Sequence, residues 1–178
     1  VMKRYRYCIL PNVVTALEFE LMNCAAGSTN GKIVLADGSE PKSIGIIHCI
    51  GSRSMEFHPY CSRVCCMTAL KYGHETKSAL PDSFVYDLYI DMHAFGKGCE
   101  DFYKRTAEMK TMFLMYGKGE SPRIVASGPD DDCEMLIKVH EKVSGEEIEV
   151  PAELVVLMVG MEAREDAARV AHLVNISI

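Results

Sequence analysis

The stretch "SIGIIHCIG", residues 43–51, decides the fold of this chain. It is an apolar run from Ile44 to Ile50 that is broken by Gly51. A short continuous apolar run bounded by turn residues is typical of a strand that is buried on both faces. Strands of this kind occur in parallel sheets that are covered by helices, so the run favours an α/β fold.

The segments that follow complete a βαβ unit. A helical pattern runs from Tyr60 to about Leu80 and is closed by Pro81, and "FVYDLYIDM", residues 84–92, is aromatic and β-branched enough for a second buried strand. Strand, helix and strand within about fifty residues imply parallel pairing with a right-handed crossover.

The rest of the chain extends this plan. We expect a helix at 100–110, a third strand at 111–116, strands near 122–127 and 133–141 that flank the acidic turn "GPDDD", another strand at "GEEIEV", and a buried strand and helix from 152 onward. The predicted fold is therefore a parallel sheet with helices and an antiparallel insertion before the last strand. We assign residues 41–178 to this α/β domain and interpret 1–40, with the helical pattern "NVVTALEFELMNCA", as a connector arm.

Composition limits the class of protein. With 178 residues and 48% hydrophobic residues, the chain is long enough for one domain with a substantial core. Its net charge of −6 and scattered Lys and Arg argue against a nucleic-acid partner. No apolar run approaches the roughly 20 residues that span a bilayer. We expect a soluble, intracellular protein, and the Val start and abrupt end suggest a piece of something longer.

Four of the eight cysteines lie close together in the sequence, at Cys49, Cys61, Cys65 and Cys66. Secreted disulfide scaffolds are usually small and poor in core residues, whereas clustered cysteines in a reducing compartment indicate metal or redox chemistry. The other four are isolated, and we interpret them as small buried hydrophobes: Cys8, Cys24, Cys99 and Cys133.

The predicted elements bring the clustered thiols to one place. Cys49 falls at the carboxyl end of the first strand and the other three at the start of the next helix, which is the edge where open parallel sheets collect ligands. Cys61 and Cys65 would share a helix face, and Cys66 would point about a hundred degrees away. A [4Fe-4S] cube suits such separated thiolates better than one tetrahedral ion, and the helix start would stabilise its negative charge.

Other interpretations stay open. A structural zinc ion and a redox disulfide both compete with the cluster, although adjacent cysteines strain a disulfide, and His48 or His58 could replace one ligand. A cofactor-free docking domain is a further alternative. The motif G-x-G-x-x-G is missing after the first strand, where "CIGSRS" stands, so the domain keeps a dinucleotide-binding plan without an obvious dinucleotide site.

Several segments resemble a known family. "PNVVTALEFE", "EPKSIGIIHCIGSR", "PYCSRVCCM", "YIDMHAFGKG" and "ELVVLMVG" are similar to the A subunit of heterodisulfide reductase and to its relatives in the quinone-interacting membrane-bound oxidoreductase of sulfate reducers. The similarity runs from about residue 10 to 173 and covers an internal part of a much longer protein.

The resemblance implies an iron-sulfur flavoprotein of anaerobic metabolism, similar to thioredoxin reductase, whose second nucleotide-binding domain carries a [4Fe-4S] cluster. The metal ligands would be Cys49, Cys61, Cys65 and Cys66. FAD would be held mainly by the adjoining domain to which residues 1–40 connect, and the partners would be other subunits of a heterodisulfide reductase or quinone-interacting complex. On this basis the chain is a cytoplasmic electron-transfer module, in some settings associated with a membrane complex, and part of an oxidoreductase rather than a catalyst alone.

Overall fold

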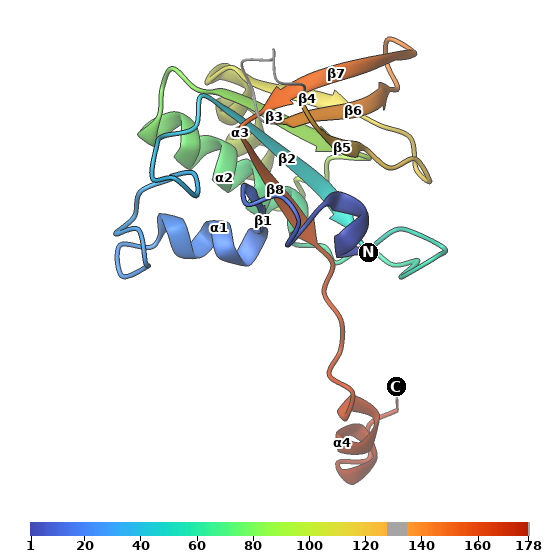
Figure 1. Cartoon of the computed structure of the whole chain (residues 1–178). Coiled ribbons are helices and arrows are strands. Elements are labelled where there is room, and N and C mark those ends of the chain that lie inside the picture. Colours follow the sequence, from blue (N-terminus) through green and yellow to red (C-terminus); the bar gives the residue numbers. More distant parts are fainter. Residues whose placement is uncertain (128–134, 178) are drawn as a thin grey trace.

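The computed structural model describes residues 1–127 and 135–177, which form a five-stranded sheet with helices and a separate three-stranded sheet (Figure 1). The larger sheet has the order β1 (Val13–Thr15), β8 (Leu154–Val159), β2 (Ser43–Ile50), β3 (Phe84–Tyr89) and β4 (Thr111–Met115), and each neighbouring pair is parallel. The predicted α/β class with a parallel sheet is confirmed.

Strand β2 is covered on both faces, as its apolar run predicts. Ile44 and Ile46 pack with residues of helix α2 (Cys65–Ala79), whereas Ile47 and Ile50 pack with residues of the three-stranded sheet. Ile44, Ile46 and Ile47 have no exposed surface. The strand is also paired with a neighbour along each edge, β8 on one side and β3 on the other.

The antiparallel insertion lies between β4 and β8 in the chain, where the sequence predicts it. It comprises β5 (Arg123–Ala126), β6 (Met135–Glu141) and β7 (Glu146–Ala152), with β6 in the middle. It approaches β2 closely, since a Cβ added at Gly45 would lie 2.3 Å from Cδ1 of Ile137. A side chain at position 45 would therefore force Ile137 to shift where the two sheets meet. The acidic turn "GPDDD" and Cys133 lie outside the described residues.

The helices differ from prediction mainly in their first residues. Helix α2 begins at Cys65 rather than at Tyr60, because Arg63 has a left-handed φ of 65° that a right-handed helix cannot accommodate. Helix α3 spans Cys99–Glu108, and α4 (Ala167–Leu173) lies apart from both sheets, at the end of an extended segment (Figure 1).

The residues before 41, expected to form a connector arm, contribute to the sheet and the core. After a 3-10 turn at Met2–Tyr5, strand β1 pairs with β8 and helix α1 (Ala16–Asn23) follows directly. The helix starts at Ala16 because Thr15 caps it and forms a capping box with Glu18. The apolar side chains of Val13, Val14 and Phe19 are buried, which is why this segment packs rather than extends. Its link to an FAD domain stays a prediction.

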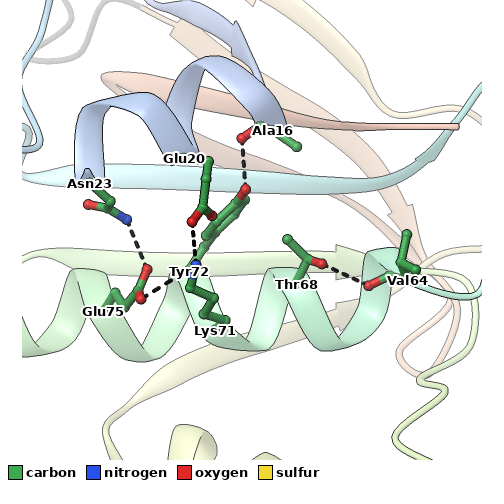
Figure 2. Close-up of polar contacts among 8 residues, drawn as sticks. All are labelled: Ala16, Glu20, Asn23, Val64, Thr68, Lys71, Tyr72 and Glu75. Atoms are coloured by element: carbon green, nitrogen blue, oxygen red, sulfur yellow. Dashed lines mark hydrogen bonds and ion pairs between the residues drawn. The ribbon is translucent and has the colours of Figure 1, made fainter. Parts of the chain in front are cut away.

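Helices α1 and α2 are joined by packing and by polar contacts (Figure 2). The ring of Phe19 is fully buried and meets Tyr72 edge to face, with 4.8 Å between the ring centroids. The Tyr72 hydroxyl donates to the carbonyl of Ala16 at 2.7 Å, and Lys71 Nζ lies 2.5 Å from Glu20 Oε1 (Figure 2). The N-terminal segment is thus fixed to the helix that begins with Cys65 and Cys66.

Phe19→Ala is expected to lower the free energy of unfolding by about 3–5 kcal/mol, because it leaves a cavity between α1, α2 and the sheet. Urea unfolding followed by circular dichroism measures the loss. Leu17→Ala is the matched control, since that side chain on the same helix is 72% exposed. Equal stability of the two variants would show that residues 1–40 do not belong to the folding unit.

Candidate functional site

The clustered cysteines lie where the carboxyl end of β2 meets the amino end of α2. Cys49 is the penultimate residue of β2, and Cys65 and Cys66 are the first two residues of α2. Cys61 lies in the loop between these elements, so the prediction that it shares a helix face with Cys65 is wrong. The cysteines nevertheless lie at the predicted edge of the sheet, which is the carboxyl end of β2.

The thiols are close enough to act on one another. Burial, opposed by the charge of Arg53 and assisted by the charges of Cys66, Cys65 and Cys61, raises the pKa of Cys49 to about 12. Burial and the charges of Cys66 and Cys61 raise the pKa of Cys65 to about 11. The structure therefore gathers the four cysteines into one neighbourhood. Within the described ranges, no three His, Cys, Asp or Glu side chains form a group that could hold a metal ion.

A bulge turns Cys49 away from the regular ladder of β2. Ile47 pairs with Leu157 and Ile50 with Val159, so β2 has one residue more than β8 over this interval. Cys49 itself has a left-handed φ of 57°. A non-glycine residue in this conformation costs about 1 kcal/mol or more and persists where its surroundings hold it.

Tyr116, which follows β4, is one of the residues that hold the backbone at Cys49 in this conformation. Its buried hydroxyl donates to the carbonyl of His48 at 2.8 Å, directly before the bulged Cys49. That carbonyl thus has a partner at the point where the β2 ladder is disturbed. Tyr116 therefore stabilises the backbone arrangement that re-aims Cys49.

The cysteine loop, residues 51–64, is folded back on itself. The N–H groups of Arg53 and Ser54 donate to the carbonyls of Tyr60 and His58, both at 2.9 Å. Gly51 begins the loop with a φ of 83°, which glycine adopts readily. These contacts give the loop a defined path between β2 and α2.

The same loop is tethered to the segment that follows β8. The Tyr60 hydroxyl donates to the Met161 carbonyl at 3.0 Å, and the Met161 N–H donates to Ser62 Oγ at 2.9 Å. His58 Nε2 lies 2.7 Å from Glu162 Oε1 and is thereby held on the surface. In the structure His58 therefore pairs with a carboxylate of this segment.

Individual sulfur atoms have backbone neighbours. The N–H of Arg63 donates to Cys61 Sγ at 3.3 Å, and the Cys66 thiol lies 3.5 Å from the carbonyl of Asp91. Cys61 Sγ also lies 3.9 Å from Nδ1 of His93. The segment after β3 thus borders the cysteines in addition to their own loop.

The arginines near the cysteines already have partners. Arg53, whose side chain is 15% exposed, forms an ion pair with Asp91 that lowers the pKa of that carboxyl group. The Arg63 guanidinium lies over the ring of Phe95, 5.3 Å from its centroid.

A cavity of about 70 Å³, which Cys49 and Arg53 help to line, lies beside the site and is too small for a nucleotide.

A buried ion pair lies beneath the start of α2. His48 and Asp87 have 0% and 1% of their side-chain surface exposed, and His48 Nε2 lies 2.8 Å from Asp87 Oδ1. Burial opposes a charge on His48, but Asp87 and Cys66 outweigh it and raise the pKa of His48 to about 10.

Cys66 shows the reciprocal effect of this pair. Burial would raise the pKa of Cys66, but His48 and a backbone N–H at His93 outweigh it and lower that pKa. The sequence suggests His48 as a replacement ligand and gives no role to Asp87. The available signal was a carboxylate in the middle of the apolar strand "FVYDLYI".

No protein-family profile matches the chain. The A subunit of the H(2)/formate:CoB-CoM heterodisulfide,ferredoxin reductase of Methanococcus maripaludis is 39% identical over 176 residues, which is 98% of this chain and 26% of that protein. The iron-sulfur A subunit of the CoB--CoM heterodisulfide reductase of Methanocaldococcus jannaschii is 35% identical over 178 residues, 99% of this chain and 26% of that protein. The chain is homologous to an internal segment of the A subunit of heterodisulfide reductase.

The chain spans about a quarter of the length of these curated relatives. Among solved structures, L-lysine 6-monooxygenase from Pseudomonas syringae aligns with 90% of this chain and 43% of its own, at a TM-score of 0.50 and 11% identity. That likeness concerns the fold. No helix within the described part of the chain is long and apolar enough to cross a membrane.

Ser62→Ala is expected to increase hydrogen exchange at the Met161 amide by about fivefold, because that N–H loses an acceptor worth about 1 kcal/mol. Exchange followed by NMR measures the effect. Ser78→Ala, which removes an exposed hydroxyl that donates to the carbonyl of His74, is the control. Unchanged protection at Met161 would show that the loop is not held to the segment after β8.

Proposed function

We propose that the chain is the electron-transfer module of an iron-sulfur flavoprotein that resembles the A subunit of heterodisulfide reductase. A [4Fe-4S] cluster held by Cys49, Cys61, Cys65 and Cys66 would supply one-electron transfer. The observation that carries the proposal is the placement of these four cysteines at the carboxyl end of β2, in the following loop and at the start of α2, in a homologue of that protein. Three of the curated relatives are themselves named iron-sulfur subunits.

The donor set and its surroundings fit such a group. The four sulfurs come from three stretches of backbone: β2, the cysteine loop and α2. A cluster takes one thiolate at each of several separated corners. Ligands that come from separate stretches of backbone therefore favour a cluster over the structural zinc ion, whose ligands converge on one point.

The chain offers donors that would offset the negative charge of ligated sulfide and thiolate. The N–H of Arg63 points to Cys61 Sγ, and α2 begins at Cys65 and Cys66, so its positive dipole end lies at the site. Hydrogen bonds to sulfur and nearby positive charge stabilise the reduced state of iron-sulfur centres.

The wider assignment follows from the relatives. The intact protein would hold FAD outside this segment, since "CIGSRS" lacks the glycine-rich turn that a dinucleotide requires. Its partners would be the other subunits of a heterodisulfide reductase or quinone-interacting complex in the cytoplasm. The chain would relay electrons between them and would not catalyse a reaction alone.

Anaerobic reconstitution with iron and sulfide is expected to give a broad absorption band near 400 nm and about four irons and four sulfides per chain. Cys65→Ser or Cys66→Ser should lose or convert the cluster, because a ligand thiolate is removed. Iron and sulfide analysis with electron paramagnetic resonance checks both results.

Cys8 and Cys24 are exposed, so the prediction that these two are buried is wrong. Cys24→Ser is the control, since Cys24 lies in the turn after α1, and Cys133→Ser is expected to behave in the same way. A folded protein that stays colourless after reconstitution would leave the cofactor-free docking domain as the function. One zinc per chain bound in place of iron would support the zinc-stabilised fold. Bleaching by Cys133→Ser, with full colour in the Cys65 and Cys66 variants, would overturn the ligand assignment.

A further inference from the structure

Arg53 turns its side chain inward from the cysteine loop. That side chain is 15% exposed, whereas Met55, two residues further on, is 88% exposed. Together with Cys49, Arg53 lines the small cavity beside the site. A charged side chain is rarely withdrawn from water without a partner, so the contact that Arg53 makes on this inner side indicates its role.

The partner is Asp91, in the segment that directly follows β3. Nη2 of Arg53 binds Oδ2 of Asp91, and within residues 1–127 and 135–177 no other acceptor meets the guanidinium. Arg53 belongs to the loop between β2 and α2, whereas Asp91 comes after the neighbouring strand of the sheet. The ion pair therefore ties the loop that carries Cys61 to a residue 38 positions further along the chain.

Residues 91–93 form a wall of the cysteine site. The carbonyl oxygen of Asp91 lies 3.5 Å from Cys66 Sγ, and Nδ1 of His93 lies 3.9 Å from Cys61 Sγ. Asp91 thus faces Cys66 with its backbone and Arg53 with its side chain. Because Arg53 holds the side chain of Asp91, it also fixes the carbonyl next to Cys66.

The backbone of this wall has few anchors of its own. Residues 91–95 belong to no helix or strand, and within the described part of the chain none of them takes part in a backbone–backbone hydrogen bond. The cysteine loop differs, since backbone hydrogen bonds at Arg53 and Ser54 hold it. A segment with few backbone hydrogen bonds opens more readily than its surroundings. The ion pair of Arg53 and Asp91 is therefore a main anchor of residues 91–93 at the site.

We propose that Arg53 is a positioning residue that acts through Asp91: it holds residues 91–93 against Cys61 and Cys66 and thereby slows the loss of the iron-sulfur cluster. The inference rests on the proposed function, since it concerns a cluster that these thiols hold. Exposed ion pairs contribute little, but a pair whose cation is mostly withdrawn from water contributes more. Arginine keeps its proton in proteins, so the charge of Arg53 is fixed.

The test is the rate at which the anaerobically reconstituted protein releases iron to a strong ferrous chelator. Arg53→Gln is expected to release iron about tenfold faster, because it removes a charged hydrogen bond, and to change the electron paramagnetic resonance spectrum of the reduced centre. Arg53→Lys should restore both wild-type values, because a single nitrogen of Arg53 meets Asp91 and an ammonium group can take its place. Asp91→Asn should match Arg53→Gln, and combining the two changes should add nothing further.

The matched control is Arg4→Gln. The ion pair of Arg4 and Glu56 also ties the cysteine loop to another segment, but its side chains are 50% and 56% exposed. An exposed pair contributes little, so iron release from this variant should equal that of the wild type.

A wild-type protein that takes up no iron and sulfide overturns the proposed function together with the inference. A wild type that loads, with Arg53→Gln releasing iron no faster than Arg4→Gln, overturns the inference alone. If Arg53→Gln itself does not load, Asp91→Asn decides by the same two measurements.

Discussion

The burial of β2 on both faces is the constraint on which the rest of the structure depends. The strand is paired along both edges and is covered by α2 on one face and by the three-stranded sheet on the other. Its carboxyl end is therefore the place where its residues can turn toward a shared site. Because the crossover of a βαβ unit returns the chain over this end, the same constraint brings the start of α2 to Cys49. The gathering of thiols follows from the pairing of the sheet.

Helix α2 and the opposite face of the sheet contribute different polar groups to the carboxyl end of β2. On the helix side, α2 brings its first turn, and the strands beneath it bring the buried pair of His48 and Asp87. On the other side, Tyr116 donates to the carbonyl of His48 beside the bulge. The ring of His48 thus lies on the helix side of the sheet. Its carbonyl accepts a hydrogen bond from Tyr116, which follows β4. His48 thus joins the buried pair with Asp87 to the backbone that positions Cys49.

The sequence predicts the parts of this arrangement that depend on burial, and it misses those that depend on single backbone conformations. The central strands and the antiparallel insertion are predicted because their apolar runs are continuous or alternate clearly. The late start of α2 depends on the left-handed Arg63, and the turn of Cys49 depends on a bulge; neither residue type indicates a positive φ. Asp87 was missed because its partner lies on a neighbouring strand. The place of β1 in the sheet was missed because this strand pairs with one near the other end of the chain.

The path of the cysteine loop leaves little room for a dinucleotide at this edge of the sheet. A pyrophosphate needs a short glycine turn whose N–H groups face it at a helix start. Here the loop crosses the end of β8 so closely that a Cβ added at Gly160 would lie 3.3 Å from Cβ of Ser52, and Gly160 N–H donates to the carbonyl of Ile50. Residues 52 and 160 thus occupy the space next to the strand end, and the loop beyond them is bonded to Met161. The backbone that would cradle a phosphate instead carries Cys61 back toward Cys65 and Cys66, so this edge presents sulfur atoms where a dinucleotide site would present amide hydrogens.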